Sequence, residues 1–141
     1  MTVLDTNVFS ALMRSQPDEL VVAWLDAQPS VSIWTTSITC LEVLYGLRTM
    51  ARGKRQLALE DAFERMLQHD LEGRILDFDL AAAREAALTS AALRSQGRPV
   101  EIRDVQIAGI VAARKGTLAT RNTKHFADTG IALVNPWETK G

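Results

Sequence analysis

Short apolar runs alternate along the chain with longer segments in which apolar residues recur at helical spacing. The short runs predict β-strands, because they are rich in β-branched residues and end at polar turns. Five such runs occur, at residues 3–4, 31–35, 75–78, 117–120 and 131–134. The longer segments predict amphipathic helices. The pattern therefore predicts strands and helices in alternation.

Apolar strands that are separated by helices predict an α/β fold: a five-stranded parallel sheet flanked by helices on both faces. Between the second and third strands, a helix that ends near Arg48 is followed by a helical pattern over residues 54–71. These two segments predict a helical hairpin arm over residues 37–71. At 141 residues the chain has the common length of one compact domain, so we expect residues 1–141 to form a single domain.

Polar residues directly follow three of the predicted strands. They are Asp5, Thr6 and Asn7 after the first strand, residues 36–39 after the second and residues 120–122 after the fourth. Ligands of parallel α/β sheets bind beyond the carboxyl ends of the strands, at the point where the strand order reverses. We therefore expect the functional site at this edge of the sheet.

Three carboxylates scattered along the chain are the candidates for that site. Asp5 ends a buried strand, Glu42 lies in the first turn of an otherwise apolar helix, and Asp104 shares a helical face with apolar residues. Each also has a structural alternative: Asp5 and Asp104 could cap helices, and Glu42 completes a capping-box pattern with Thr39. Position alone leaves both interpretations open.

Three carboxylates at one sheet edge repel each other, and burial without partners is costly for each of them. A divalent cation would resolve this conflict. Oxygen ligands without a nearby cluster of His or Cys favour Mg²⁺, with Mn²⁺ as an alternative, over Zn²⁺. His69 and His125 share no ligand spacing, so we interpret both as surface or packing residues.

The composition narrows the function classes further. The net charge is −1 and 47% of the residues are hydrophobic, a globular balance without the positive charge of a general nucleic-acid binder. The single Cys40 excludes an internal disulfide, and no apolar run approaches the roughly 18 residues that a membrane span needs. We therefore expect a cytoplasmic protein without a membrane segment.

Five motifs, in order along the whole chain, resemble those of PIN-domain ribonucleases, and within them the VapC and FitB type of toxin from type II toxin–antitoxin modules. The motifs are Val-Leu-Asp-Thr-Asn-Val at residues 3–8, Thr-Cys-Leu-Glu-Val-Leu-Tyr-Gly at 39–46, Arg-Asp-Val-Gln-Ile-Ala at 103–108, Thr-Arg-Asn-Thr-Lys-His-Phe at 120–126 and Asn-Pro-Trp at 135–137. The resemblance implies a PIN-like sandwich. It also implies a homodimer, and a cognate antitoxin that masks the site and joins the toxin on operator DNA.

The resemblance further implies a metal site with three ligands, Asp5, Glu42 and Asp104, and with Thr6, Asn7 and Thr120 nearby. One position departs from the family pattern. Relatives often carry a fourth acid in the segment aligned with residues 120–126, where this chain has Asn122. Asn122 could supply a carbonyl oxygen or orient a water, and Asp128 is the alternative. We therefore expect a single metal ion in the free protein.

Together these features predict a metal-dependent endoribonuclease that hydrolyses RNA phosphodiester bonds with Mg²⁺. The expected catalytic residues are Asp5, Glu42, Asp104 and Asn122, and the expected substrate-binding residues are Thr6, Asn7, Thr120 and Arg121. Two alternatives stay open. One is a metal-dependent phosphatase of similar layered fold, which would want an acid where Asn7 stands; the other is a non-catalytic protein-binding module stabilised by a cation.

Overall fold

The structure is a computed structural model of the chain that describes residues 1–138. Five strands form one sheet in the order β3-β2-β1-β4-β5, and every neighbouring pair is parallel. The strands are β1 (Thr2–Leu4), β2 (Ile33–Thr36), β3 (Ile75–Leu76), β4 (Thr117–Ala119) and β5 (Ala132–Val134). The predicted five-stranded parallel sheet is therefore confirmed.

The central strand β1 marks the point where the strand order reverses. Val3 of β1 pairs with Trp34 of β2 on one side and with Leu118 of β4 on the other. From β1 the chain adds β2 and β3 on one side, then returns to add β4 and β5 on the other. The carboxyl ends of β1 and β4 thus form the crevice in which parallel α/β proteins bind ligands.

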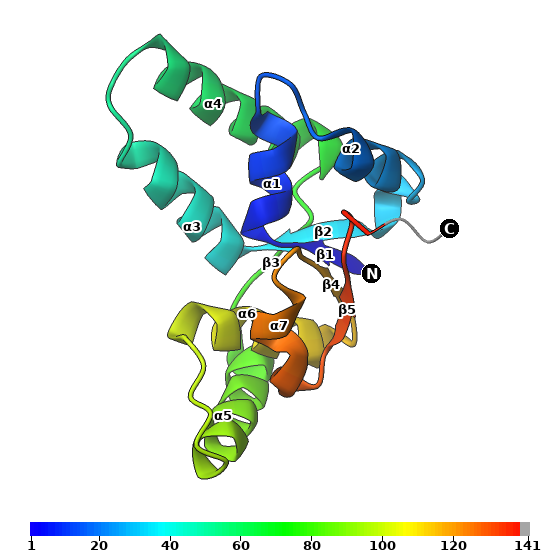
Figure 1. The fold of residues 1–141 in the computed structure, drawn as a ribbon, viewed down its shortest axis with the longest axis vertical. Coiled ribbons are helices and arrows are strands. Elements are labelled where there is room, and N and C mark those ends of the chain that lie inside the picture. Colours follow the sequence, from blue (N-terminus) through cyan, green and yellow to red (C-terminus); the bar gives the residue numbers. More distant parts are fainter. Residues whose placement is uncertain (139–141) are drawn as a thin grey trace.

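Helices cover both faces of the sheet (Figure 1). The helices of the upper layer in this view are α1 (Thr6–Met13), α2 (Glu19–Asp26), α3 (Ser37–Arg48) and α4 (Lys54–Arg65). The lower layer holds α5 (Leu80–Ser95), α6 (Ile102–Arg114), α7 (Thr123–Phe126) and the 3₁₀ turn η3 (Ala127–Thr129). Separate apolar cores fill the two layers, around Phe9 and Phe63 above the sheet and around Ile107 and Phe126 below it. No helix within residues 1–138 is long and apolar enough to cross a membrane.

The helices α3 and α4 form the predicted hairpin arm, which projects at the upper left of Figure 1. Gln56 Nε2 donates to the Leu47 carbonyl at 2.9 Å, and Arg48 pairs with Glu60 at 3.0 Å, so polar contacts connect the two helices. The helical pattern over residues 54–71 is divided in two. Beyond α4, Met66–Asp70 (η2) forms a π-helical turn in which the Leu71 N–H donates to the Met66 carbonyl.

Four strands are shorter than the apolar pattern predicts: β4 and β5 each lack one terminal residue, and β2 and β3 differ for a clear local reason. β2 begins only at Ile33, because Ser30–Ser32 (η1) folds into a 3₁₀ turn after Pro29. β3 ends at Leu76, because the Asp79 N–H bonds to the Asp77 carbonyl at 2.9 Å and turns the chain into α5. In both cases a local turn takes up residues that the β-branched and aromatic composition assigned to a strand.

The backbone of α6 at Gly109 packs closely against the backbone of α5. A Cβ added at Gly109 would lie 2.5 Å from the Ala82 carbonyl oxygen and 2.9 Å from the Ala86 Cβ, which is closer than real Cβ atoms approach. Glycine at this position therefore permits the close contact between the two helices. The contact fixes α6, whose first turn carries Asp104.

Candidate active site

Asp5 directly follows the central strand and is buried, with 5% of the residue exposed. Its Oδ1 accepts the Thr6 backbone N–H at 2.8 Å, and its Oδ2 accepts the Thr120 hydroxyl at 2.8 Å. Asp5 is the N-cap of α1, as the structural alternative predicted. It also lies at the carboxyl edge of the sheet. The two interpretations are compatible, because capping uses one lone pair of Oδ1 and leaves acceptor capacity on both carboxylate oxygens.

The buried Thr120 side chain, just after β4, connects Asp5 to its neighbours. Its Oγ1 donates to Asp5 and accepts hydrogen bonds from Asn7 Nδ2 at 3.2 Å and from the Asn122 backbone N–H at 3.1 Å. The Asn7 Oδ1 accepts the Arg121 backbone N–H at 3.2 Å. A hydroxyl offers one donor and two acceptor lone pairs, so Thr120 uses its whole hydrogen-bonding capacity to join α1 to the loop after β4.

Glu42 reaches the same place from the second turn of α3, so its expected position in the first turn is wrong. The capping box with Thr39 is also absent, because the N-cap is Thr36, whose Oγ1 accepts the Thr39 N–H at 2.9 Å. Helix α3 thus begins three residues earlier than that pattern requires. The Glu42 side chain is free of capping: Oε1 accepts the Thr6 hydroxyl at 3.2 Å, and Oε2 lies 4.0 Å from an Arg103 nitrogen.

Asp104 lies in the first turn of α6 but does not cap it. The cap is Glu101, whose Oε2 accepts the backbone N–H groups of Arg103 at 2.9 Å and Asp104 at 3.3 Å. The Asp104 carboxylate is therefore available for another partner. Its Oδ2 lies 3.9 Å from Nδ1 of His125 on α7, an exposed residue. His125 is on the surface, as expected, but the sequence did not indicate its position beside this carboxylate.

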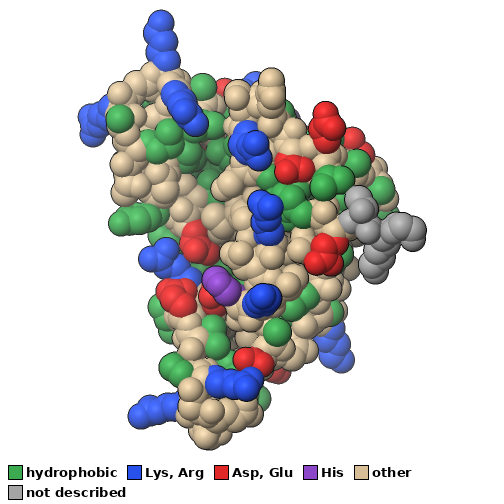
Figure 2. Space-filling model, in the orientation of Figure 1, with side chains coloured by type: hydrophobic (Ala, Val, Ile, Leu, Met, Phe, Trp, Pro, Cys, Tyr) green, Lys and Arg blue, Asp and Glu red, His purple; other side chains and the backbone are tan. Residues whose placement is uncertain are grey.

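The three carboxylates line one cavity of about 290 Å³ at the reversal of strand order. Its lining comprises Asp5, Thr6, Asn7, Ser10, Glu42, Asp104, Asn122 and Phe126. On the face drawn in Figure 2, acidic side chains, a histidine and Lys or Arg side chains lie together over the junction of α3, α6 and α7. Ser10 and Phe126 were not predicted. Ser10 follows Thr6 by one helical turn, a spacing that could have indicated it.

Burial raises the pKa of all three carboxyl groups. For Asp5 the loss of hydration is the main cause, and two hydrogen bonds, the stronger from Thr120, oppose it. For Glu42 burial comes first and the negative charge of Asp5 second. For Asp104 burial is followed by the charges of Glu101 and Asp5. The cavity therefore gathers carboxylates whose ionised forms would gain from a nearby cation.

The donor chemistry of this cavity fits Mg²⁺ or Mn²⁺, which prefer carboxylate and carbonyl oxygens. Within residues 1–138, no three Asp, Glu, His or Cys side chains converge closely enough to form a complete metal site. Mg²⁺ is commonly held by one or two carboxylates and keeps several waters. An ion in this cavity would therefore complete its coordination with water or substrate oxygens.

The candidates for the place of a fourth acid, and Arg121, differ in where they lie relative to the cavity. Asn122 lines the cavity, whereas Asp128 pairs with Arg98 at 3.1 Å and is not part of the lining. Arg121 is exposed and also lies outside the lining, with its guanidinium carbon 5.1 Å from the centre of the Trp137 ring. Of the two candidates for the place of a fourth acid, only Asn122 therefore faces the carboxylates.

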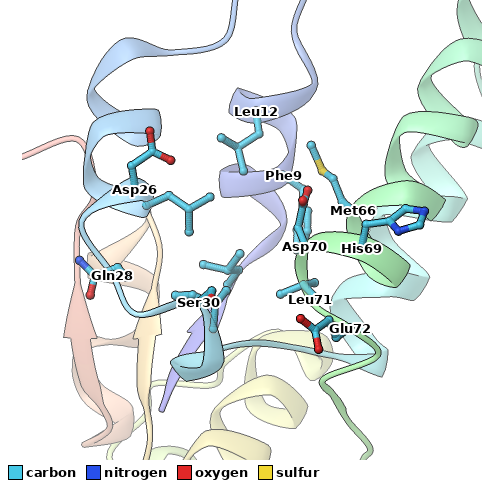
Figure 3. A pocket seen from close by; sticks show the side chains of 13 residues that line it. Phe9, Leu12, Asp26, Gln28, Ser30, Met66, His69, Asp70, Leu71 and Glu72 are labelled. Carbon is cyan, nitrogen blue, oxygen red and sulfur yellow. The ribbon is translucent and has the colours of Figure 1, made fainter.

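A larger cavity, of about 520 Å³, contains none of the three carboxylates. Figure 3 shows its labelled side chains coming from α1, from α2, from the segment after α2 that includes η1, and from the segment that includes the π-helical turn. Apolar residues such as Phe9 and Leu12 share the lining with Asp26, Asp70 and Glu72. His69 also lines it and is exposed. The lining of this cavity is therefore a mixture of apolar and acidic side chains.

Fold and site together define a parallel α/β protein with a carboxylate-lined ligand cavity at its reversal of strand order. The chain belongs to the PIN-domain family, whose profile matches residues 2–132. This finding and the relatives below confirm the resemblance carried by the five motifs.

Two similar proteins and one solved structure illustrate the relationship. The VapC ribonuclease Y4jK of Sinorhizobium fredii is 38% identical over 138 residues, which cover 98% of this chain and 99% of that protein. The toxin FitB of Neisseria gonorrhoeae is 34% identical, over 97% of this chain and 99% of its own. A solved structure of FitAB bound to a DNA fragment superposes with a TM-score of 0.90 at 33% identity, covering 100% of this chain and 99% of the other.

Proposed function

We propose that this chain is a metal-dependent endoribonuclease that hydrolyses RNA phosphodiester bonds, and that it is the toxin of a type II toxin–antitoxin pair. The observation that carries the proposal is the meeting of Asp5, Glu42 and Asp104 in one cavity. Membership of the PIN-domain family supports the nuclease chemistry. The likeness to a VapC ribonuclease and to the FitB toxin supports RNA as the substrate and the toxin role.

Asp5 and Asp104 are the proposed principal ligands of Mg²⁺, or of Mn²⁺, and Glu42 would complete the metal's coordination or orient the attacking water. Each Asp5 oxygen accepts one hydrogen bond, which leaves each with a further lone pair for a cation. A bound ion would polarise the scissile phosphate and lower the pKa of the attacking water. Because Asn122 replaces an acid, we propose one ion in the free protein.

The neighbouring polar residues divide into two proposed roles. Thr120 and Asn7 are positioning residues. The buried Thr120 hydroxyl holds the Asp5 carboxylate, and the Asn7 amide holds Thr120 and the backbone of the loop after β4. The Thr6 hydroxyl orients Glu42 in the same way. Asn122 borders the cavity and could orient water or substrate through its amide.

The cognate antitoxin is the proposed protein partner, and operator DNA is contacted only through it. The likeness to FitAB, which was solved on DNA, supports this assignment. The larger cavity could accept an apolar side chain of such a partner, with Asp26, Asp70 and Glu72 favouring a basic neighbour. A complex of this kind would form in the cytoplasm.

A homodimer is also part of the proposal. Three large apolar side chains of the arm are exposed, namely Leu41 (54%), Tyr45 (60%) and Leu57 (65%). Exposed apolar groups on a projecting arm favour contact with another chain. Light scattering should give twice the monomer mass, and a strict monomer at high concentration would remove this part of the proposal.

Cleavage of RNA by purified variants tests the catalytic proposal. With Mg²⁺ or Mn²⁺ the wild-type chain should cleave single-stranded RNA or tRNA, and EDTA should stop it. Asp5→Asn and Asp104→Asn should each lower the rate at least about a hundredfold without unfolding the chain, because the amide keeps the shape but loses the charge that holds the cation. The matched control is Asp128→Asn, an acid outside the cavity, which should leave the rate unchanged.

Retained metal-dependent cleavage by either cavity variant would refute the assignment of the site. Hydrolysis of p-nitrophenyl phosphate without cleavage of RNA would instead favour the phosphatase alternative. If the folded protein hydrolyses neither substrate with either metal, the cation-stabilised binding module becomes the better account.

A further inference from the structure

The guanidinium of Arg121 is held through its flat face, by an aromatic ring, and not through the N–H groups at its edge. Its central carbon lies over the Trp137 ring, 5.1 Å from the centre, and among residues 1–138 it forms no ion pair. Arg98, by contrast, lies 3.1 Å from an acid. An aromatic ring contacts the face of a guanidinium, which leaves the N–H donors in the plane and the positive charge available.

The Trp137 ring is itself fixed in place. Its indole Nε1 donates to Oδ2 of Asp18 at 3.2 Å, and its backbone N–H donates to Oδ1 of Asn135 at 3.0 Å. The other oxygen of Asp18 caps α2 by accepting the Leu20 N–H at 3.0 Å. The ring is therefore held between the end of β5 and the start of α2, and it offers Arg121 a fixed platform.

The backbone of Arg121 adjoins the carboxylate cavity, although neither Arg121 nor Trp137 is part of its lining. Arg121 directly follows Thr120, the partner of Asp5, and its backbone N–H donates to Asn7, which lines the cavity. The residue after it, Asn122, lines the cavity too. A cavity that gathers three acids repels the phosphates of RNA, so a cation with free donors at its border would offset that repulsion for an approaching strand.

We propose that Trp137 is a positioning residue that presents Arg121 as a clamp for a backbone phosphate of RNA beside the cavity. The inference rests on the proposed ribonuclease function. Arg121 binds the phosphate through its free edge, where two parallel N–H groups match two phosphate oxygens. Trp137 acts only through Arg121, by holding its guanidinium flat against the ring and leaving the N–H edge open to a phosphate.

The binding of a fluorescein-labelled single-stranded RNA of about 20 nucleotides tests this proposal. Fluorescence anisotropy is measured with Mg²⁺ in the full-length Asp104→Asn background, which is not expected to cleave the probe. Arg121→Ala should weaken binding about fivefold and lower the slope of log K against log salt by about 0.7, the value of one phosphate contact on a single strand. Trp137→Met, which fills space without a ring, should change both quantities in the same direction.

Three further variants separate this role from a merely structural one. Trp137→Phe keeps an aromatic face and should retain most of the affinity and the salt slope. The double variant Arg121→Ala/Trp137→Met should bind no more weakly than Arg121→Ala alone, since Trp137 acts through Arg121. Arg114→Ala is the matched control, because Arg114 pairs with Asp79 at 3.0 Å at the far end of α6 from Asp104, and it should change nothing.

Several results would overturn the inference while leaving the ribonuclease proposal intact. Unchanged RNA binding by Arg121→Ala would do so, and this exposed substitution tests the clamp even if the Trp137→Met variant fails to fold. Additive losses in the double variant would mean that the ring contacts RNA or supports the fold independently. Absence of both RNA binding in the Asp104→Asn background and cleavage by the wild type would instead refute the proposed function, and the clamp with it.

Discussion

Replacing Thr120 by valine removes the hydroxyl that donates a hydrogen bond to Asp5. The substitution keeps the shape of the side chain but leaves the buried Asp5 Oδ2 without its donor at 2.8 Å. A hydrogen bond to a charged group contributes about 1.5–3 kcal/mol. The Asn7 side-chain amide and the Asn122 backbone N–H also lose an acceptor, but neither residue is fully buried, so water can replace it. We therefore expect Thr120→Val to lower the free energy of unfolding by about 1.5–3 kcal/mol at pH 7.

Urea unfolding at pH 7 measures this loss. Thr120→Ser, which keeps the hydroxyl, should lose much less stability, and Thr117→Val at the other end of β4 serves as the control for the same exchange away from the site. Without this donor the Asp5 carboxylate keeps the Thr6 N–H but is held less firmly, so metal affinity and RNA cleavage should fall about 10–100-fold. A Thr120→Val protein with wild-type stability and wild-type metal affinity would refute the positioning role of Thr120.

Three other predictions follow from burial. The pKa of Asp104 is raised in the folded chain, so its ionisation lowers the stability of the folded state as pH rises past the pKa of the unfolded chain. Asp104→Asn removes this cost and should raise the melting temperature in EDTA at pH 8 but not at pH 3. In a denaturant titration, Gly109→Ala should lower the free energy of unfolding by about 1–3 kcal/mol, because its Cβ would meet the Ala82 carbonyl. Gly46 lies on α3 in open space, so Gly46→Ala should raise the free energy of unfolding by about 0.5–1 kcal/mol. Burial, followed by the charge of Glu64, raises the pKa of Cys40 to about 11, so iodoacetamide at pH 8 should label the native thiol at least about tenfold more slowly than the urea-unfolded one.

The sheet and its site edge could be predicted from the sequence because both depend on local pattern. A short apolar run followed directly by a polar residue indicates a strand end, and this placed Asp5 correctly beyond β1. The first residue of a helix could not be predicted where several neighbouring residues could serve as its N-cap. Thr36 and Thr39 both suit an N-cap, and the side chains of both are buried beside the sheet; the choice of Thr36 moved Glu42 from the first turn to the second.

Contacts between distant segments could not be predicted from local pattern. The approach of His125 to Asp104 joins α7 to α6, and the contact of Arg121 with Trp137 joins the end of β4 to the segment after β5. Neither pair has a characteristic sequence spacing, since the geometry arises only when the sheet brings the elements together. The cap of α6 was missed for a different reason, because Glu101 is not among the residue types that usually cap helices.

Metal binding tests the central claim most directly. Isothermal titration of the full chain with MnCl₂ at pH 7.5 should show one ion per chain. Asp104→Asn should abolish this binding, whereas Asp128→Asn should bind as the wild type does, because Asp128 pairs with Arg98 outside the cavity. Binding that persists unchanged in Asp104→Asn, or a wild-type chain that binds no metal, would contradict a catalytic metal site built on these carboxylates.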